Sequence, residues 1–218
     1  MILHLITDRM RLCPDGDEAA RSACLRAQAR YAVAAGIDVI QVRERDLDGR
    51  RLAALAQAIV ALARGSSTKV VINDRLDVAL AAGADGVHLR GDSFAAARVR
   101  SIAPAGFLIG RSVHSVDEVQ RAGPVDYVVA GTVWATSSKP DGHPLLGPKG
   151  LAAVVAASPA PVIGIGGVDV GRATTLASAG AAGGAAVGAF QRQGSGCLAM
   201  PLQTVTLVFR QAFVAANM

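Results

Sequence analysis

Short apolar runs alternate with longer amphipathic stretches along the whole chain of 218 residues. Each apolar run ends in a polar residue or a glycine, which is typical of short strands buried in a parallel sheet. The runs expected as strands are Ile2–Thr7, Val39–Val42, Lys69–Ile72, Gly86–Leu89, Phe107–Gly110, Tyr127–Ala130, Pro161–Ile165 and Gly184–Val187.

Helical stretches follow these runs, and the first of them closes at Gly36, a suitable C-terminal cap. Eight alternations of strand and helix without a linker predict an α/β fold, a single (β/α)8 TIM barrel that spans residues 1–218. The usual dinucleotide fingerprint of an open doubly wound sheet is absent. The expected helices are Glu18–Ala35, Arg50–Arg64, Leu76–Ala82, Phe94–Ile102, Val116–Ala122, Leu151–Ala157, Val170–Ala179 and Met200–Ala216.

Composition narrows the classes of function. Apolar residues make up 51% of the chain, yet Gly, Pro or charge interrupts every apolar run before the length of about 18 residues that a membrane span needs. The first residues also lack a signal-peptide pattern, so a soluble cytoplasmic protein is expected. The net charge is +5, but no basic stripe with stacking aromatics is evident. A small anionic substrate therefore fits better than a nucleic acid.

Two expected strand ends near the carboxyl end of the chain are followed by glycine. Gly166 and Gly167 follow one strand, and Val187 and Gly188 close the next. Glycine lets the backbone approach a ligand, and the start of a following helix favours a phosphate. Strands seven and eight of a (β/α)8 barrel form such a phosphate site. Tight turns are the alternative for either pair alone, but the spacing of the two pairs favours a phosphate site.

The second strand leads into two arginines. Alternation along the strand puts Gln41, Arg43 and Arg45 on one face. Two guanidiniums on one face suit a pyrophosphate, because each offers a bidentate fork. The alternative is that both arginines pair with Glu44 and Asp46 at the rim of the barrel.

The third and sixth strands also end in polar residues. Asn73 and Asp74 suit a pyrimidine edge and a Mg2+ ion, or else they cap the next helix. The long loop Gly131–Gly147 carries a further anion-binding set, for which the alternative is an ordinary turn with an exposed lysine. That set is Thr136, Ser138 and Lys139.

Three histidines lie in or just after expected strands. His114 follows the fifth strand, where it either moves protons near neutral pH or merely lies on the rim. His88 is expected to be a satisfied core residue, and His4 carries the same ambiguity.

Together these segments resemble the thiamine phosphate synthase and thiazole tautomerase superfamily of thiamine biosynthesis. The likeness covers nearly the whole chain, and each segment lies at an expected strand end. The segments are HLITD (4–8), QVRERD (41–46), INDRLDVAL (72–80), GADGVHL (83–89), IGRSVHS (109–115), DYVVAGTVWATSSKP (126–140) and IGIGGV (163–168).

A synthase of this superfamily joins hydroxymethylpyrimidine diphosphate to thiazole phosphate. Pyrophosphate leaves with the help of Mg2+, and the thiazole nitrogen captures the pyrimidine cation. The resemblance then implies pyrophosphate at Gln41, Arg43 and Arg45, pyrimidine and metal at Asn73 and Asp74, bridging contacts from Thr136, Ser138 and Lys139, and thiazole phosphate at Gly166, Gly167, Val187 and Gly188.

Three departures from the synthase pattern stand out. Arg45 takes the place of a lysine, and Gly188 takes the place of the usual serine. Ser93 takes the place of a metal-binding aspartate, and Asp92 lies one position early. Since Mg2+ tolerates little distortion of its octahedron, this displaced carboxylate counts most against a synthase.

The tautomerase branch resembles the chain at the RER segment, at 91–94 and at GRSVHS. A tautomerase shifts a proton on a carboxylated thiazole phosphate without a metal; His114 would carry the proton and Arg43 would hold the carboxylate. The displaced carboxylate makes this thiazole tautomerase, with no cofactor, the leading hypothesis. The alternative is a thiamine phosphate synthase with Mg2+ at Asp74 and Asp92, and a non-catalytic regulator that binds a phosphate ligand ranks third. The sequence leaves a homodimer open.

Overall fold

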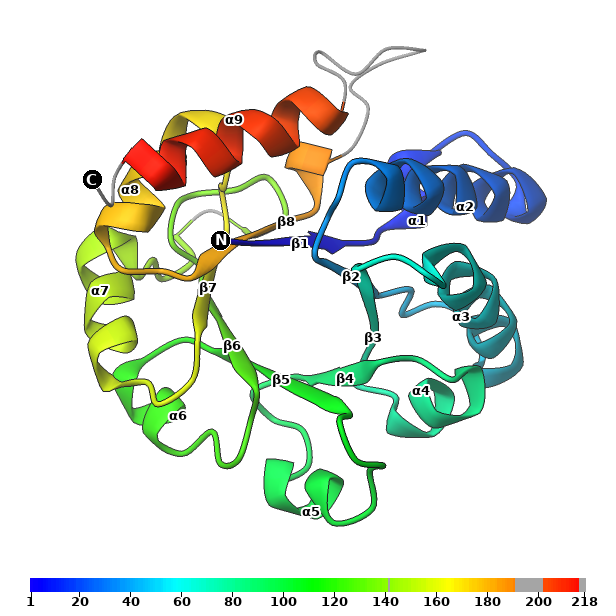
Figure 1. Cartoon of the computed structure of the whole chain (residues 1–218), viewed down its shortest axis with the longest axis horizontal. Helices are drawn as coiled ribbons and strands as arrows, with labels where there is room; N and C mark the ends of the chain where they lie inside the picture. The colour runs from blue at the N-terminus through cyan, green and yellow to red at the C-terminus, as the bar shows by residue number, and fades with distance from the viewer. Residues whose placement is uncertain (141, 191–201, 216–218) are drawn as a thin grey trace.

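A closed ring of eight strands forms the centre of the molecule, with the helices outside it (Figure 1). The computed structural model describes residues 1–140, 142–190 and 202–215. Each strand pairs in parallel with the next, and β8 pairs with β1, so the predicted (β/α)8 TIM barrel is confirmed. The strands are β1 (Ile2–Ile6), β2 (Val39–Val42), β3 (Lys69–Asn73), β4 (Gly86–Leu89), β5 (Leu108–Val113), β6 (Tyr127–Gly131), β7 (Val162–Ile165) and β8 (Gly183–Ala186).

The outer ring consists of short and medium helices. No helix within the described ranges is both long and apolar enough to cross a lipid bilayer. The helices are α1 (Arg9–Leu12), α2 (Glu18–Ala34), α3 (Gly49–Ala63), α4 (Leu76–Ala82), α5 (Ala96–Arg100), α6 (Val116–Gln120), α7 (Gly147–Ala157), α8 (Ala173–Ser178) and α9 (Leu202–Ala215), with 3-10 turns η1 (Val170–Arg172) and η2 (Gly188–Phe190).

Several helices differ from the expected bounds. The helix expected from Val170 begins as the 3-10 turn η1, which Asp169 caps by accepting the Arg172 N–H at 3.0 Å. A glycine in this first turn disfavours regular helix. Helix α1 was not predicted; it exists because the side chain of Asp8 accepts the Arg11 N–H at 3.0 Å. Positions 200, 201 and 216 of the last expected helix lie outside the described residues.

Strand β5 is longer than the sequence predicted, since it continues past Gly110 to Val113. Its pairing with β6 continues over these added residues. The extension makes Arg111 and Ser112 part of a strand, so their side chains point to opposite faces. Ser112 faces the barrel interior, where its Oγ lies 2.9 Å from Nε2 of His88.

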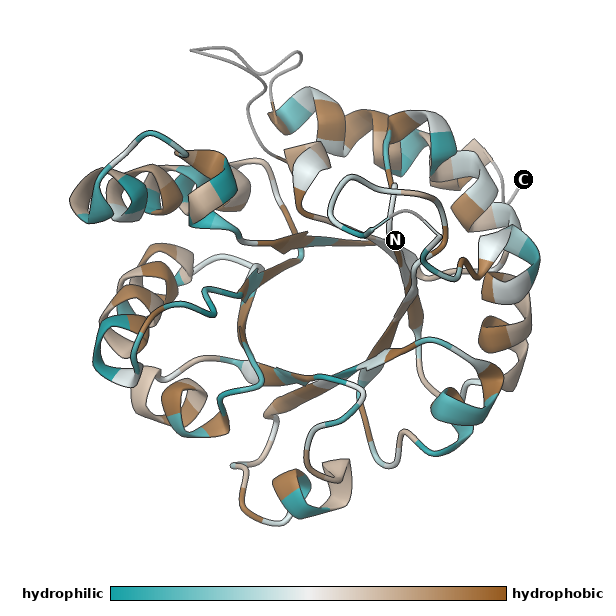
Figure 2. Cartoon of the chain, turned by 180° about the vertical axis from the view of Figure 1, so that it is seen from behind, coloured by the Kyte–Doolittle hydropathy of each residue, from teal (hydrophilic) through white to brown (hydrophobic). Residues whose placement is uncertain are grey.

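The main core lies between the strands and the helices, and a smaller cluster fills the barrel. Figure 2 shows the strands mostly in the colour of hydrophobic residues, while the helices carry both colours. Inside the barrel, Gly110 makes room for the ring of Tyr127, which a Cβ at that position would overlap. The interior cluster consists of Ile6, Tyr127, Val129, Ile163 and Ala185.

Two histidines join Tyr127 in the barrel interior. The ring centroids of His4 and His88 are 6.1 Å apart, and both rings lie within 5.7 Å of Tyr127. Nδ1 of His88 is 3.3 Å from the Tyr127 hydroxyl, so His88 is the satisfied core residue that the sequence predicted. Burial lowers the pKa of His4 to about 4 and the pKa of His88 to about 3. Both rings are therefore neutral near pH 7.

These two neutral rings predict a pH-dependent stability. Below about pH 6.5 the unfolded chain gains protons on His4 and His88 that the folded barrel does not, so the free energy of unfolding falls as the pH drops toward about 4. The expected loss is about 1.4 kcal/mol per histidine for each pH unit. Urea denaturation across this pH range measures the slope. The slope should be smaller in His88→Asn than in His143→Gln, a change in an outer loop, and equal slopes would contradict the prediction.

Candidate functional site

A cavity of about 790 Å³ opens at the carboxyl ends of the strands, where (β/α)8 barrels place their sites. It lies within the size range of small-molecule sites. Three predicted residues are sequence neighbours of lining residues but do not line the cavity themselves: Asp74, Gly167 and Gly188. The predicted residues that the structure brings together in the lining are Gln41, Arg43, Arg45, Asn73, Asp92, His114, Thr136, Ser138, Lys139, Gly166 and Val187.

Basic side chains outnumber acidic ones around this cavity. Seven basic residues and three acidic ones line it, a balance that favours a polyanionic ligand. Four of the arginines were missed from the sequence. Arg90 and Arg111 lie at the carboxyl ends of β4 and β5, which could have marked them. The basic residues are Arg11, Arg43, Arg45, Arg90, Arg111, Arg121 and Lys139, and the acidic ones are Asp8, Asp92 and Glu118.

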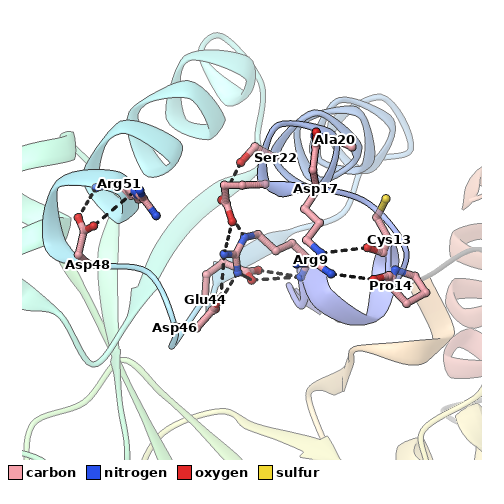
Figure 3. Close-up of polar contacts among 12 residues, drawn as sticks. Arg9, Cys13, Pro14, Asp17, Ala20, Ser22, Glu44, Asp46, Asp48 and Arg51 are labelled. Atoms are coloured by element: carbon pink, nitrogen blue, oxygen red, sulfur yellow. Dashed lines mark hydrogen bonds and ion pairs between the residues drawn. The ribbon is translucent and has the colours of Figure 1, made fainter.

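A buried arginine determines how the RER segment is arranged (Figure 3). Arg9 is 1% exposed, and its guanidinium contacts three carboxylates. It lies 2.7 Å from Asp46, 2.9 Å from Glu18 and 3.4 Å from Glu44. The alternative that Arg43 and Arg45 pair with Glu44 and Asp46 is therefore wrong, because Arg9 holds both carboxylates.

Thr7 links this cluster to the cavity. Its hydroxyl donates to Glu44 at 2.6 Å and accepts the backbone N–H of Arg43 at 2.9 Å. Strand β2 ends at Val42, so Arg43 and Arg45 lie in the segment after it; Glu44 turns toward Arg9, and both arginines line the cavity.

The charges around Arg43 are unbalanced. Burial, followed by the neighbouring charge of Arg45, lowers the pKa of Arg43, and Arg90 acts in the same direction. Arg9 holds the pKa of Asp46 below its usual range through a hydrogen bond, whereas burial raises the pKa of Glu44. Like charges crowded beside a cavity are typical of a site that binds an anion.

Gln41 and Asn73 form a polar pair on the wall of the cavity. Nε2 of Gln41 donates to Oδ1 of Asn73 at 2.9 Å. Oε1 of Gln41 is buried and has no hydrogen-bond partner among the described residues. Such an orphaned acceptor costs free energy unless a ligand donates to it. The alternative that Asn73 or Asp74 caps the next helix is wrong, since the N-cap of α4 is Arg75.

Asp74 and Asp92, the expected metal ligands, do not form an open pair of carboxylates. Oδ1 of Asp74 accepts a hydrogen bond from the hydroxyl of Ser93, and Oδ2 lies 3.7 Å from the guanidinium of Arg90. The same guanidinium lies 2.6 Å from Asp92. Mg2+ needs carboxylate oxygens in near-octahedral geometry. The residues present therefore do not fit a two-carboxylate Mg2+ site.

The turn after β7 has a backbone conformation that favours glycine. Gly166 and Gly167 have φ of 97° and 62°, and a Cβ at Gly166 would overlap Thr132. The ends of β7 and β8 are neighbours, so Val187 lies close to this turn. The segments after β7 and β8 begin as the short 3-10 turns η1 and η2 and not as regular helices. A phosphate here would therefore be bound by the backbone of the turns and not by a helix dipole.

The loop after β6 contains a hydrogen-bonded turn, and its side chains form part of the cavity wall. Lys139 N–H donates to the Thr136 carbonyl at 3.1 Å, and the hydroxyls of Thr136 and Ser138 are 3.2 Å apart. Arg11 reaches across from α1 to donate to the Ser137 hydroxyl at 3.1 Å. The turn expected as the alternative is present, and its side chains still line the cavity.

His114 lies at the rim beside a carboxylate. Its Nδ1 is 3.0 Å from Oε2 of Glu118, and its backbone N–H donates to the same oxygen at 2.8 Å. The side chain is 52% exposed and contributes to the cavity lining.

The family model described as thiamine monophosphate synthase matches residues 5–190. The chain belongs to this family. A thiamine-phosphate synthase of Roseiflexus sp. (strain RS-1) is 38% identical over 190 residues, 86% of this chain and 77% of that protein. One of Methanoculleus marisnigri is 42% identical over 168 residues, 76% of this chain and 80% of that protein. The solved thiamine phosphate pyrophosphorylase from Pyrococcus furiosus superposes with a TM-score of 0.80 at 28% identity, covering 100% of this chain and 97% of that one.

Membership of the thiamine monophosphate synthase family confirms the resemblance and the expectation of an enzyme. The leading hypothesis, a thiazole tautomerase, is wrong, because these relatives are thiamine-phosphate synthases. At position 93, where the synthase pattern has a metal-binding aspartate, the Ser93 hydroxyl donates a hydrogen bond to Asp74, and Arg90 contacts both Asp74 and Asp92.

Arg9 is predicted to be essential for stability in this family member. Arg9→Gln leaves Glu44 buried without its cation, so the free energy of unfolding should fall by about 3–5 kcal/mol. Urea denaturation monitored by circular dichroism measures the change. The control is Arg51→Gln, which removes a pair with Asp48 from a side chain that is 68% exposed and should leave the free energy of unfolding nearly unchanged. Similar losses in both variants would contradict the prediction.

Proposed function

We propose that this chain is a thiamine phosphate synthase, which joins hydroxymethylpyrimidine diphosphate to thiazole phosphate and releases pyrophosphate. The observation that carries the proposal is the orientation of Arg43 and Arg45. Arg9 takes both neighbouring carboxylates, Glu44 and Asp46, and the two guanidiniums line the same cavity as the glycine turn after β7. A substrate with a diphosphate group and a substrate with a single phosphate group meet in one electropositive pocket.

The diphosphate end of the pyrimidine substrate binds at Arg43 and Arg45. When the bond between the methylene carbon and the diphosphate oxygen breaks, both electrons stay on the oxygen. Bidentate arginine forks then stabilise the negative charge that develops there. Family resemblance implies Mg2+ as a further charge, but the side chains at Asp74 and Asp92 do not fit it, and no step here depends on it.

The pyrimidine ring binds beside β2, β3 and β5. Gln41 and Asn73 both line this part of the cavity, and the hydrogen bond between them fixes the orientation of the Gln41 amide. Ser112, held at 2.9 Å from His88, offers a second polar contact on the cavity wall.

The thiazole phosphate binds at the ends of β7 and β8. Backbone groups of Gly166 and Val187, which line the cavity there, contact its phosphate, and Gly167 and Gly188 continue the two turns behind them. A second set of side chains, Thr136, Ser138 and Lys139, lines the same cavity and supplies hydroxyl groups and a cation for the two anions. The lone pair of the thiazole nitrogen then forms the new C–N bond with the pyrimidine methylene cation.

Formation of thiamine phosphate from the two purified substrates tests this function. The wild-type protein should form it, and Arg43→Gln should lower kcat/KM about 100-fold, since a charged bidentate contact contributes about 3 kcal/mol. Arg50→Gln, which removes an exposed arginine of α3, is the matched control and should retain activity. A wild-type protein that forms no thiamine phosphate would contradict the proposal.

His114 separates a coupling reaction from a proton shift. The thiazole nitrogen attacks through a free lone pair, so this step needs no proton carrier. His114→Asn should therefore keep thiamine phosphate formation within about tenfold of wild type. A loss of about 100-fold or more would show instead that the His114–Glu118 pair transfers a proton in the reaction.

A further inference from the structure

Arg90 lies between two carboxylates at the start of the β4–α5 loop. Its guanidinium is 2.6 Å from Asp92 and 3.7 Å from Asp74. The side chain is 47% exposed and lines the cavity. A fixed protein cation therefore occupies the space between the two residues that the sequence assigned to a metal ion.

Hydrogen bonds between Ser93 and Arg90 hold the turn that carries Arg90. The Ser93 hydroxyl accepts the Arg90 backbone N–H at 2.9 Å and donates to Oδ1 of Asp74. The Ser93 N–H also donates to the Arg90 carbonyl at 3.2 Å. One oxygen of Asp74 is thus used by a hydroxyl, while the other faces the guanidinium.

Arg111 holds the same loop from β5. Its guanidinium donates to the carbonyls of Gly91 and Phe94 at 2.9 Å and to the carbonyl of Ser93 at 3.3 Å. A shift of the backbone at Asp92 toward Asp74 would have to break these bonds. The arrangement around Arg90 is therefore built into the loop.

Arg90 also belongs to the group of like charges at the cavity. It lies close enough to Arg43 for the two charges to act on each other, and Arg45 adds a third. A polyanion bound among the three guanidiniums would turn this repulsion into attraction.

We propose that Arg90 is a catalytic residue, which binds the diphosphate of the pyrimidine substrate and stabilises the charge that develops as pyrophosphate leaves. This inference rests on the proposed synthase function. Arg90 supplies charge that the family resemblance assigns to Mg2+, so pyrophosphate binding by this chain depends on Mg2+ only weakly. The bond that breaks is the carbon–oxygen bond of the substrate, and its electron pair goes to the oxygen that Arg90, Arg43 and Arg45 face.

Calorimetric titration with inorganic pyrophosphate, in EDTA and again in Mg2+, tests the proposal without turnover. The wild-type Kd in EDTA should lie within about tenfold of the Kd in Mg2+. Arg90→Gln should weaken binding in EDTA by about tenfold or more, as expected for loss of a charged hydrogen bond. Arg98→Gln, an exposed arginine on α5, is the matched control and should bind as the wild type does.

Two results would overturn the proposal. One is wild-type binding of pyrophosphate that disappears in EDTA. The other is an Arg90→Gln variant that binds as tightly as the wild type in EDTA.

A second variant tests the exchange of arginine for metal directly. Arg90→Gly combined with Ser93→Asp removes the cation and places a carboxylate five residues after His88. This double variant should bind pyrophosphate at least about tenfold more tightly in Mg2+ than in EDTA. Equal binding in the two solutions would count against the exchange.

The assay of thiamine phosphate formation keeps this inference separate from the proposed function. A wild-type protein that makes no product refutes the synthase, whereas the pyrophosphate titrations still measure what Arg90 binds. A wild-type protein that makes product but loses all activity in EDTA supports the synthase and refutes the weak dependence on Mg2+.

Discussion

One buried guanidinium fixes the rim of this barrel. Arg9 is shielded from solvent and must be compensated there, because an unpaired buried charge is very costly. Its three carboxylate partners come from α2 and from the segment after β2. Because Arg9 pairs with Glu44 and Asp46, these carboxylates do not neutralise Arg43 and Arg45, which line the cavity. The positive charge of the cavity depends on this pairing.

The two halves of the barrel contribute to the cavity in different ways. Strands β2 to β5 supply side chains, mainly arginines and the Gln41–Asn73 pair. Strands β7 and β8 supply backbone, at turns where Gly166 and Gly167 have positive φ. Side chains with rigid forks suit a leaving group whose charge changes during the reaction, whereas backbone amides suit a phosphate whose charge stays constant. A coupling of two phosphorylated substrates uses both.

The barrel could be predicted from the sequence alone, because each strand is a short apolar run that ends in a polar residue or a glycine. It was less reliable for short helices such as α5, whose ends depend on packing rather than on caps, and for β5, whose last residues are held by pairing with β6. The role of Arg9 could not be predicted, since its partners lie up to 37 residues away and meet only in the folded barrel. The choice of tautomerase failed for a similar reason: Ser93 was recognisable as a missing carboxylate, but the contact of Arg90 with Asp74 was not.

The loop between β4 and α5 is held by its own carbonyl groups, which donors on Arg111 engage. Carbonyl groups are the same for every amino acid, so these bonds to Arg111 do not depend on the side chains of the loop, whereas the hydroxyl of Ser93 adds bonds of its own to the Arg90 N–H and to Asp74. A Cβ at Gly91 would also meet no atom closer than 3.7 Å. Substitutions at Arg90 and Asp92 therefore leave the bonds from Arg111 to the loop in place. Evolution can exchange acidic for basic chemistry here as a local change on an unchanged scaffold.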